Sequence, residues 1–160
     1  MDKIKLYLDT NMTLDFFINE ATRIKGKGDI KVPEKTKFMT DNIEKMEFTT
    51  SFLTKAEIMR ELVTGHDIES PQVEEMWSDL MKSLNNPHYI KEFKFDEKLV
   101  EMAGKLKLRL RTLFNFQHLY IAIDTKSYFV SGDKDIINKI RENLLYDKSL
   151  TYIELRQLIS

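Results

Sequence analysis

The sequence predicts an α/β sandwich around a mostly parallel sheet. Three observations support this fold class: short β-rich stretches alternate with amphipathic segments, helix-capping residues follow these stretches, and the length of 160 residues suits one core. Apolar residues make up 42% of the chain and charged residues 32%, which is typical of a folded domain. We therefore expect a single domain over residues 1–160.

Composition and charge exclude several classes of protein. The chain has no cysteine, which removes disulfides, thiolate chemistry and cysteine-bound zinc. It shows neither a signal-peptide core at its start nor an apolar run of about 18 residues, so we expect a cytoplasmic protein without a membrane partner. The 25 basic residues nearly balance the 26 acidic ones, and net charge therefore gives no argument for a polyanionic partner.

The first third of the chain predicts two strands, each followed by a helix. IKLYL, residues 4–8, alternates like a strand and stops at the cap-forming residues 9–11, after which MTLDFFINEA is amphipathic. EFTTS, residues 47–51, is β-rich, and TKAEIMRELV after it resumes helical periodicity. This is the order expected of parallel strands joined by helices.

A basic segment separates these two units. Residues 22–37 lack periodicity and carry two glycines, one proline and six basic residues against two acidic ones. We expect a mobile, positively charged loop, which is either a solvated surface or a contact for a phosphate backbone. Four apolar residues after it share one face of a short predicted helix: Phe38, Met39, Ile43 and Met46.

The middle of the chain is predicted to be mainly helical. Pro71 begins PQVEEMWSDLMKSL in the first helical turn, where proline is tolerated, and residues 85–87 end that helix. YIKEFKF, residues 89–95, is predicted as a short extended piece. Apolar residues from Leu99 to Leu113 step by three and four, which predicts one long helix.

The last third of the chain returns to alternating helices and strands. LFNFQHLYIAID, residues 113–124, predicts an apolar helix with a polar start. SYFVS, residues 127–131, predicts a buried strand, and a helix follows from about Asp135. Thr151 and Glu154 have the spacing of a capping box, so a final helix is expected over YIELRQLI.

Acidic residues follow the predicted strands. Asp9 ends the first strand, Asp133 follows SYFVS, and Glu57 lies early in the helix after FTTS. If these strands are parallel neighbours, the three carboxylates converge on the sheet edge where ligands bind. Such clusters bind hard cations like Mg²⁺ or Mn²⁺, because carboxylates without a cation repel one another. The pattern predicts metal-assisted chemistry on a phosphate.

Each acid also has a structural interpretation, which the sequence leaves open. Asp9 is placed to cap the helix that follows it. Asp133 and Asp135 fit a turn and an N-cap before the next helix. Thr54 and Glu57 have the spacing of a capping box. The order of the acids along the chain, rather than any single position, favours a shared site.

The order of four short segments resembles the PIN domain family. The segments are LYLDTN, TTSFLTKAEIMREL, NFQHLYIAI and YFVSGDKDI, and the resemblance extends from Ile4 to about Ile159. It implies a three-layer α/β/α sandwich with a mostly parallel central sheet and a metal-dependent ribonuclease, as in the VapC-like toxins of prokaryotic toxin–antitoxin pairs. It also implies RNA as the substrate, an antitoxin protein as a partner, and a homodimer.

The resemblance assigns roles to particular residues of this chain. Asp9, Glu57 and Asp133 match family acids and are the expected ligands of Mg²⁺ or Mn²⁺, while Asn115 stands at the position of another family acid. Together these four form the expected catalytic set. Supporting roles are expected for polar residues beside the first and last acids: Thr10, Asn11, Ser131 and Asp135.

Asn115 departs from the family pattern. The third family acid lies three residues before a His, whereas this chain has Asn115 in that place before His118. An amide carries no negative charge but keeps a carbonyl oxygen that can coordinate a cation. Two hypotheses follow: an RNA endonuclease with a reduced or substrate-dependent metal requirement, and a catalytically weakened or inactive PIN-fold module that binds RNA or protein. We expect His118 to be a hydrogen-bonded packing residue outside the catalytic set.

Overall fold

A parallel sheet lies at the centre of the protein. The computed structural model describes residues 2–27, 31–92, 97–107 and 109–160. Within these ranges five strands form one all-parallel sheet with the order β3-β2-β1-β4-β5. The strands are β1 (Ile4–Tyr7), β2 (Met46–Ser51), β3 (His88–Ile90), β4 (Tyr128–Ser131) and β5 (Ser149–Thr151).

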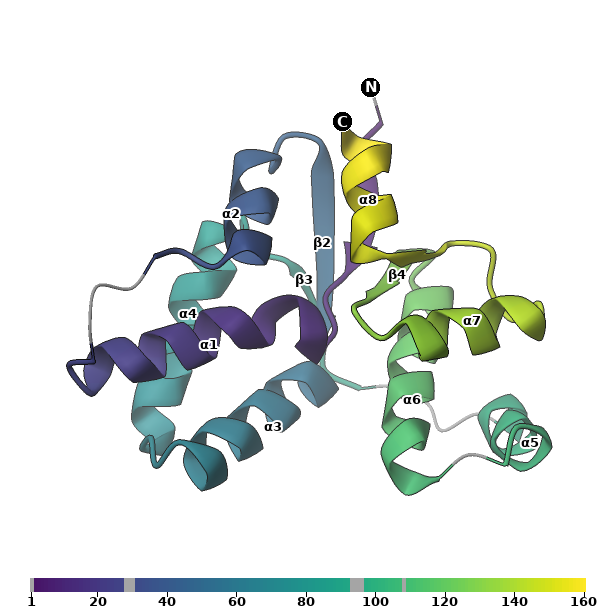
Figure 1. Ribbon diagram of the computed structural model, residues 1–160, viewed down its shortest axis with the longest axis horizontal. Coiled ribbons are helices and arrows are strands. Elements are labelled where there is room, and N and C mark those ends of the chain that lie inside the picture. The colour runs from purple at the N-terminus through teal and green to yellow at the C-terminus, as the bar shows by residue number, and fades with distance from the viewer. Residues whose placement is uncertain (1, 28–30, 93–96, 108) are drawn as a thin grey trace.

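Helices cover both faces of the sheet and complete a three-layer α/β/α sandwich (Figure 1). In chain order they are α1 (Thr10–Ile24), α2 (Glu34–Asp41), α3 (Phe52–Arg60), the π-helical turn η1 (Glu61–Gly65), α4 (Ser70–Ser83), α5 (Glu97–Lys105), α6 (Leu110–Asp124), α7 (Lys134–Glu142) and α8 (Tyr152–Ile159). Figure 1 shows α1 to α4 on one side of the strands and α5 to α7 on the other. The predicted fold class is confirmed.

Alternate residues of the central strands enter two separate cores. In β1, Leu6 packs with α1, α3, α4 and α8, whereas Tyr7 packs with α6 and α7 on the opposite face. In β4, Val130 joins the first core and Phe129 the second. Both faces are buried where β1 and β4 pair, at Leu6–Tyr7 and at Phe129–Val130, and the residues there are apolar or aromatic, as in parallel strands of α/β proteins generally.

The strand order reverses beside β1. From β1 the chain moves outward through β2 and β3, and it then returns to add β4 and β5 on the other side of β1. In β1 and β4, Leu6 is paired with Tyr128 and Tyr7 with Phe129. The carboxyl ends of β1 and β4 therefore flank the topological switch point, which is where open α/β sheets bind their ligands.

The single long helix predicted between Leu99 and Leu113 is wrong. The structure has two helices here, because α5 ends at Lys105 and α6 begins at Leu110. Lys107 between them has a left-handed backbone with φ of 49°, which no continuous α-helix allows. Apolar spacing alone did not reveal this interruption, because the apolar residues on both sides keep steps of three and four.

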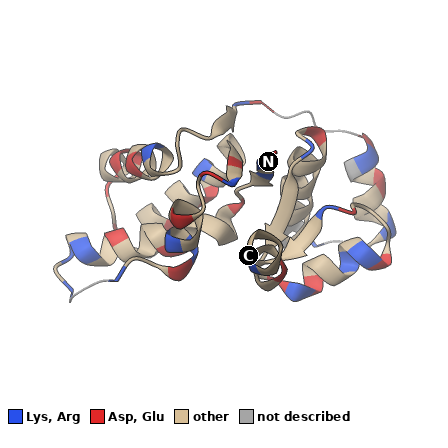
Figure 2. Ribbon diagram, turned by 90° about the horizontal axis from the view of Figure 1, so that it is seen from above, with Lys and Arg blue, Asp and Glu red and all other residues tan. Residues whose placement is uncertain are grey.

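The basic loop is shorter than predicted. Helix α1 continues to Ile24 and α2 already begins at Glu34, so both ends of the predicted loop over residues 22–37 are helical. Residues 28–30 of this segment lie outside the described residues, and Figure 2 shows Lys and Arg on both sides of their trace. The short helix predicted next ends at Asp41, so it does not include Ile43 or Met46.

Two extended segments also differ from the predictions. The piece predicted over residues 89–95 is the short strand β3, which covers His88–Ile90, and residues 93–96 lie outside the described residues. Strand β5 over Ser149–Thr151 was not predicted, because three residues are too few to show an alternation. In the part of the chain that the structure describes, no helix is both long and apolar enough to cross a membrane.

Candidate functional site

Asp9 lies at the carboxyl end of β1 and caps α1. Its Oδ1 accepts a hydrogen bond from the backbone N–H of Met12 at 3.1 Å, which confirms the capping interpretation. The side chain is buried, and burial raises the pKa of this carboxyl to about 6, against the lowering effects of His118 and of the Met12 bond. A nearby cation stabilises the ionised form of a buried acid more than that of an exposed acid. Because the cap uses only Oδ1, capping and cation binding are compatible.

Glu57 extends from α3 toward α6. Its Oε1 is hydrogen-bonded to Nε2 of His118, and its negative charge is close enough to Asp9 to raise the pKa of that acid further. The predicted capping box of Thr54 and Glu57 is wrong. Helix α3 begins at Phe52, and Ser51 is its N-cap, with Oγ accepting from the backbone N–H of Thr54. Glu57 is therefore free to contact another helix.

A buried chain of hydrogen bonds supports Glu57. The Tyr7 hydroxyl lies 2.7 Å from Ser51 Oγ and 2.7 Å from His118 Nδ1. His118 is 2% exposed and has a partner at each ring nitrogen, which confirms that it is a hydrogen-bonded packing residue. Burial raises the pKa of the Tyr7 phenol well above its usual value, so the phenol stays neutral. These hydrogen bonds link β2, β1, α6 and α3.

Asp133 follows β4 and caps α7. Its Oδ1 accepts from the backbone N–H groups of Asp135 at 2.9 Å and Ile136 at 3.4 Å, which confirms the N-cap interpretation. Ser131 Oγ accepts from the backbone N–H of Asp133 at 3.1 Å and so helps to fix the turn. Asp133 and Asp135 are both exposed. Asp133 thus stands at the open side of the switch point, whereas Asp9 is buried.

Asn115 and Thr10 occupy different parts of this region. Asn115 is half-buried in the second turn of α6, not at the start of the helix as predicted, and it precedes His118 by three residues on the same side of α6. Thr10 follows Asp9 directly, and its Oγ1 is buried without a hydrogen-bond partner among the described residues. An unpaired buried oxygen beside an acid is expected where a ligand or water binds.

The carboxylates fit a divalent cation only in part. Among the residues that the structure describes, no group of three or more His, Asp or Glu side chains lies close enough together to hold a metal ion. Asp9 and Glu57 are electrostatically coupled, but one oxygen of Glu57 is already bonded to His118. A cation at Asp9 would therefore take several of its oxygens from water and from a bound phosphate, as Mg²⁺ commonly does.

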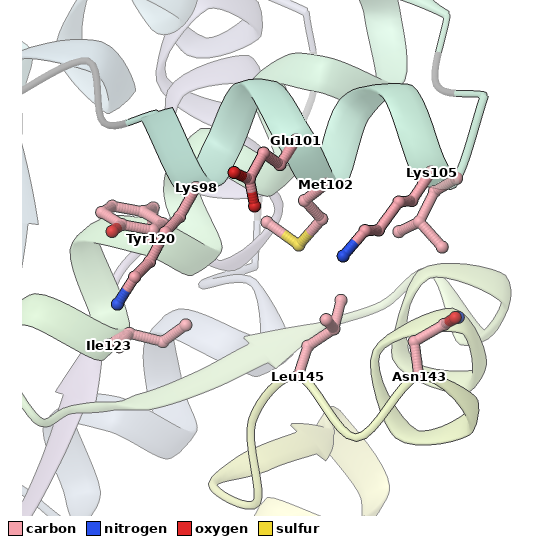
Figure 3. Close-up of a pocket in the computed structure, with 9 residues that line it drawn as sticks. Lys98, Glu101, Met102, Lys105, Tyr120, Ile123, Asn143 and Leu145 are labelled. Carbon is pink, nitrogen blue, oxygen red and sulfur yellow. The ribbon is translucent and has the colours of Figure 1, made fainter.

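A separate cavity of about 450 Å³ lies between α5 and α6. Figure 3 shows Lys98 and Lys105 extending from α5, with Glu101 and Met102 of the same helix between them. Its lining residues are Lys98, Glu101, Met102, Lys105, Leu106, Tyr120, Ile123, Asn143 and Leu145. None of the predicted site residues lines this cavity. It is therefore distinct from the sheet edge that carries Asp9, Glu57 and Asp133, which we call the acidic edge.

Comparison of the chain with protein-family models, with curated proteins and with solved structures gave no match.

Proposed function

We propose that the protein is a metal-dependent RNA endonuclease of PIN type that hydrolyses phosphodiester bonds. The observation that carries the proposal is the placement of Asp9 and Asp133 two residues after the ends of β1 and β4, the strands that flank the switch point. Glu57, coupled to Asp9 and held by His118, adds a third acid from the helix after β2. The sequence also resembles VapC-like toxins of the PIN domain family. The proposal therefore includes a homodimeric toxin with an antitoxin partner.

Each acid has a distinct task in this mechanism. Bound Mg²⁺ or Mn²⁺ would lower the pKa of a water molecule and stabilise charge on the phosphate oxygens. Asp9, which is buried, would hold the cation, and Asp133, which is exposed, would supply a further carboxylate where the phosphate enters. His118 fixes the direction of Glu57, while Tyr7 fixes His118. Asn115 would contribute a neutral oxygen in place of a carboxylate. Cation binding beside Asn115 would therefore depend more on oxygens of the substrate.

The first test is cleavage of RNA by the Asp9→Asn variant. The amide can still accept the capping hydrogen bond, so the variant should fold, but it loses the buried negative charge. With structured RNA and Mn²⁺ or Mg²⁺, we expect wild-type cleavage and a rate at least about 100-fold lower in the variant, comparable to the loss of other electrostatic groups in active sites.

The matched control is Asp124→Asn, which removes an exposed acid at the end of α6. This variant should cleave RNA at the wild-type rate. Equal cleavage by the wild type and by Asp9→Asn would indicate a contaminating nuclease and would contradict the proposal.

A non-catalytic module that binds RNA or protein is the second candidate. It is favoured by Asn115 and by the lack of a three-acid group among the described residues. Under this candidate, Asn115→Asp should create cleavage or raise it by about tenfold or more, since a carboxylate supplies the missing charge. Gel assays of both proteins in Mn²⁺ distinguish the two functions. A wild type as active as Asn115→Asp would exclude the non-catalytic candidate.

A further inference from the structure

Lys35 places a positive charge across the switch point. It lies in the first turn of α2, and its Nζ donates a hydrogen bond to the backbone oxygen of Asn11 at 2.8 Å. The position that a Cβ at Gly132 would occupy is 3.9 Å from the same Nζ. Asn11 follows β1 and Gly132 follows β4, so the ammonium group reaches the two chain segments that carry Asp9 and Asp133.

The surroundings of Lys35 neutralise its charge only in part. Besides Asp15 and Asn11, its Nζ has the ring of Tyr152 near it, with the ring centroid 6.0 Å away. Its side chain is 22% exposed, and its nearest carboxylate, Asp15, lies at 3.9 Å and is itself 54% exposed. Such an ion pair is weak because water and salt screen it. An ammonium group has three donors, and the Asn11 oxygen uses one of them. The charge also acts on the buried acid, since it lowers the pKa of Asp9.

Gly132 has no side chain between the backbone after β4 and the Lys35 ammonium. Its backbone does not adopt the left-handed conformation, so the turn does not demand glycine for its torsion angles. The missing side chain leaves the backbone after β4 uncovered opposite the Lys35 ammonium. A phosphate group at the turn after β4 would therefore meet the ammonium of Lys35 beside Gly132.

We propose that Lys35 binds a non-bridging phosphate oxygen of the RNA at the edge formed by Asp9, Asn11 and Gly132. This inference rests on the proposed function, because it names the group that holds the substrate at the same site. Lys35 thereby offsets the repulsion between the acids and the incoming phosphodiester, which a bound cation alone would have to overcome. The alternative is that Lys35 only ties α2 to α1.

The test is the salt dependence of RNA binding. Wild type and Lys35→Gln are titrated with a fluorescent single-stranded RNA of ten nucleotides, in Ca²⁺ in place of Mg²⁺, between 50 and 300 mM KCl. Loss of one phosphate contact should reduce the slope of log K against log salt by about 0.7 and weaken binding several-fold at low salt. Lys35→Arg should retain the wild-type slope, because it keeps the charge.

Lys37→Gln is the matched control. It removes the same charge from the same helix. Lys37 is 65% exposed, however, and it pairs with Asp41 at 2.5 Å rather than with the segments that carry Asp9 and Asp133. Its slope should stay at the wild-type value. Equal slopes for Lys35→Gln and Lys37→Gln would overturn the inference and leave Lys35 as a tie between helices, a role that melting temperature alone would report.

Cleavage kinetics separate this inference from the proposed function. In Mg²⁺ we expect Lys35→Gln to raise KM several-fold with a smaller change in kcat, since the contact is made with bound substrate as well as in the transition state. If the wild type cleaves RNA but Lys35→Gln has wild-type KM and slope, only the inference on Lys35 is overturned. If the wild type neither binds nor cleaves RNA, both proposals are overturned.

Discussion

Asp9 combines two roles that the sequence presented as alternatives. As an N-cap it accepts a hydrogen bond from Met12, and as a buried acid it has a pKa raised to about 6 by burial. The cap is a local feature that any Asp before a helix provides. The raised pKa is a tertiary feature, because it depends on the elements that cover the side chain and on the nearby charge of Glu57.

The raised pKa of Asp9 predicts how stability depends on pH. In the folded protein Asp9 keeps its proton up to about pH 6, whereas in the unfolded chain it releases the proton near pH 3.8. The contribution of protonated Asp9 to the free energy of unfolding is therefore lost as the pH rises from 3.8 to about 6. Without divalent cations, Asp9→Asn should therefore be more stable than the wild type at pH 7.5, by up to about 3 kcal/mol. Below pH 4 this advantage should vanish.

Urea unfolding at pH 4, 5.5 and 7.5 in EDTA measures this difference. Added Mn²⁺ should reduce the advantage of the Asn variant at pH 7.5, because a cation that binds ionised Asp9 stabilises the wild type. A difference in unfolding free energy that stays constant across the three pH values would contradict the assignment of the raised pKa.

At the scale of elements, hydrogen bonds between side chains determine how α3 and α6 meet. Tyr7 in β1 contacts Ser51 at the end of β2 and His118 in α6, and His118 contacts Glu57 in α3. These groups are far apart in the sequence, and all of them meet beside the acidic edge. The chain of contacts sets the direction of Glu57 before any cation binds.

Tyr7→Phe tests this chain of contacts. The change keeps the ring and removes the hydroxyl, which leaves buried His118 Nδ1 without a partner and takes from Ser51 Oγ one of its two hydrogen bonds. We expect the free energy of unfolding to fall by about 1–3 kcal/mol in urea titrations. RNA cleavage should also fall, because Glu57 loses its support.

Tyr89→Phe is the control, since the Tyr89 ring is part-buried in the other core and its hydroxyl has no hydrogen bond within the described residues. It should change the unfolding free energy by less than about 0.5 kcal/mol. Equal effects of the two substitutions would contradict a structural role for the Tyr7 hydroxyl.

Helix caps show which elements could be predicted. The capping box of Thr151 and Glu154 is present as predicted, because both bonds lie within four residues of sequence. The predicted box of Thr54 and Glu57 is absent, although its spacing is the same. Ser51 already caps that helix, and Glu57 is bonded to His118 instead. Local spacing could not distinguish the two cases.

At the scale of the whole molecule, one sheet supports two cores. Trp77 and Phe17 belong to the core beneath α1 and α4, and Phe129 belongs to the core beneath α6 and α7. Adjacent residues of β1 and β4 point into opposite cores. Unfolding of one core would therefore displace strands on which the other core packs. The protein should therefore unfold as one cooperative unit, as the prediction of a single domain requires.

Phe129→Ala tests this cooperativity. Phe129 is 1% exposed, and its truncation should lower the free energy of unfolding by about 3–5 kcal/mol. Trp77 is the only tryptophan and reports on the opposite face of the sheet. Its fluorescence midpoint in urea should fall together with the midpoint from circular dichroism. An unchanged Trp77 midpoint would show two independently folding halves.

The sequence by itself determined the alternation of strands and helices, and it placed Asp9, Glu57 and Asp133 after three of its β-rich stretches. These features depend on neighbours along the chain, namely apolar period, capping residues and turn residues. Only the tertiary structure decided that β1 and β4 are adjacent, that Glu57 bonds to His118, and that Lys35 reaches both strand ends. Such contacts join residues far apart in the sequence, and no local pattern encodes their distances.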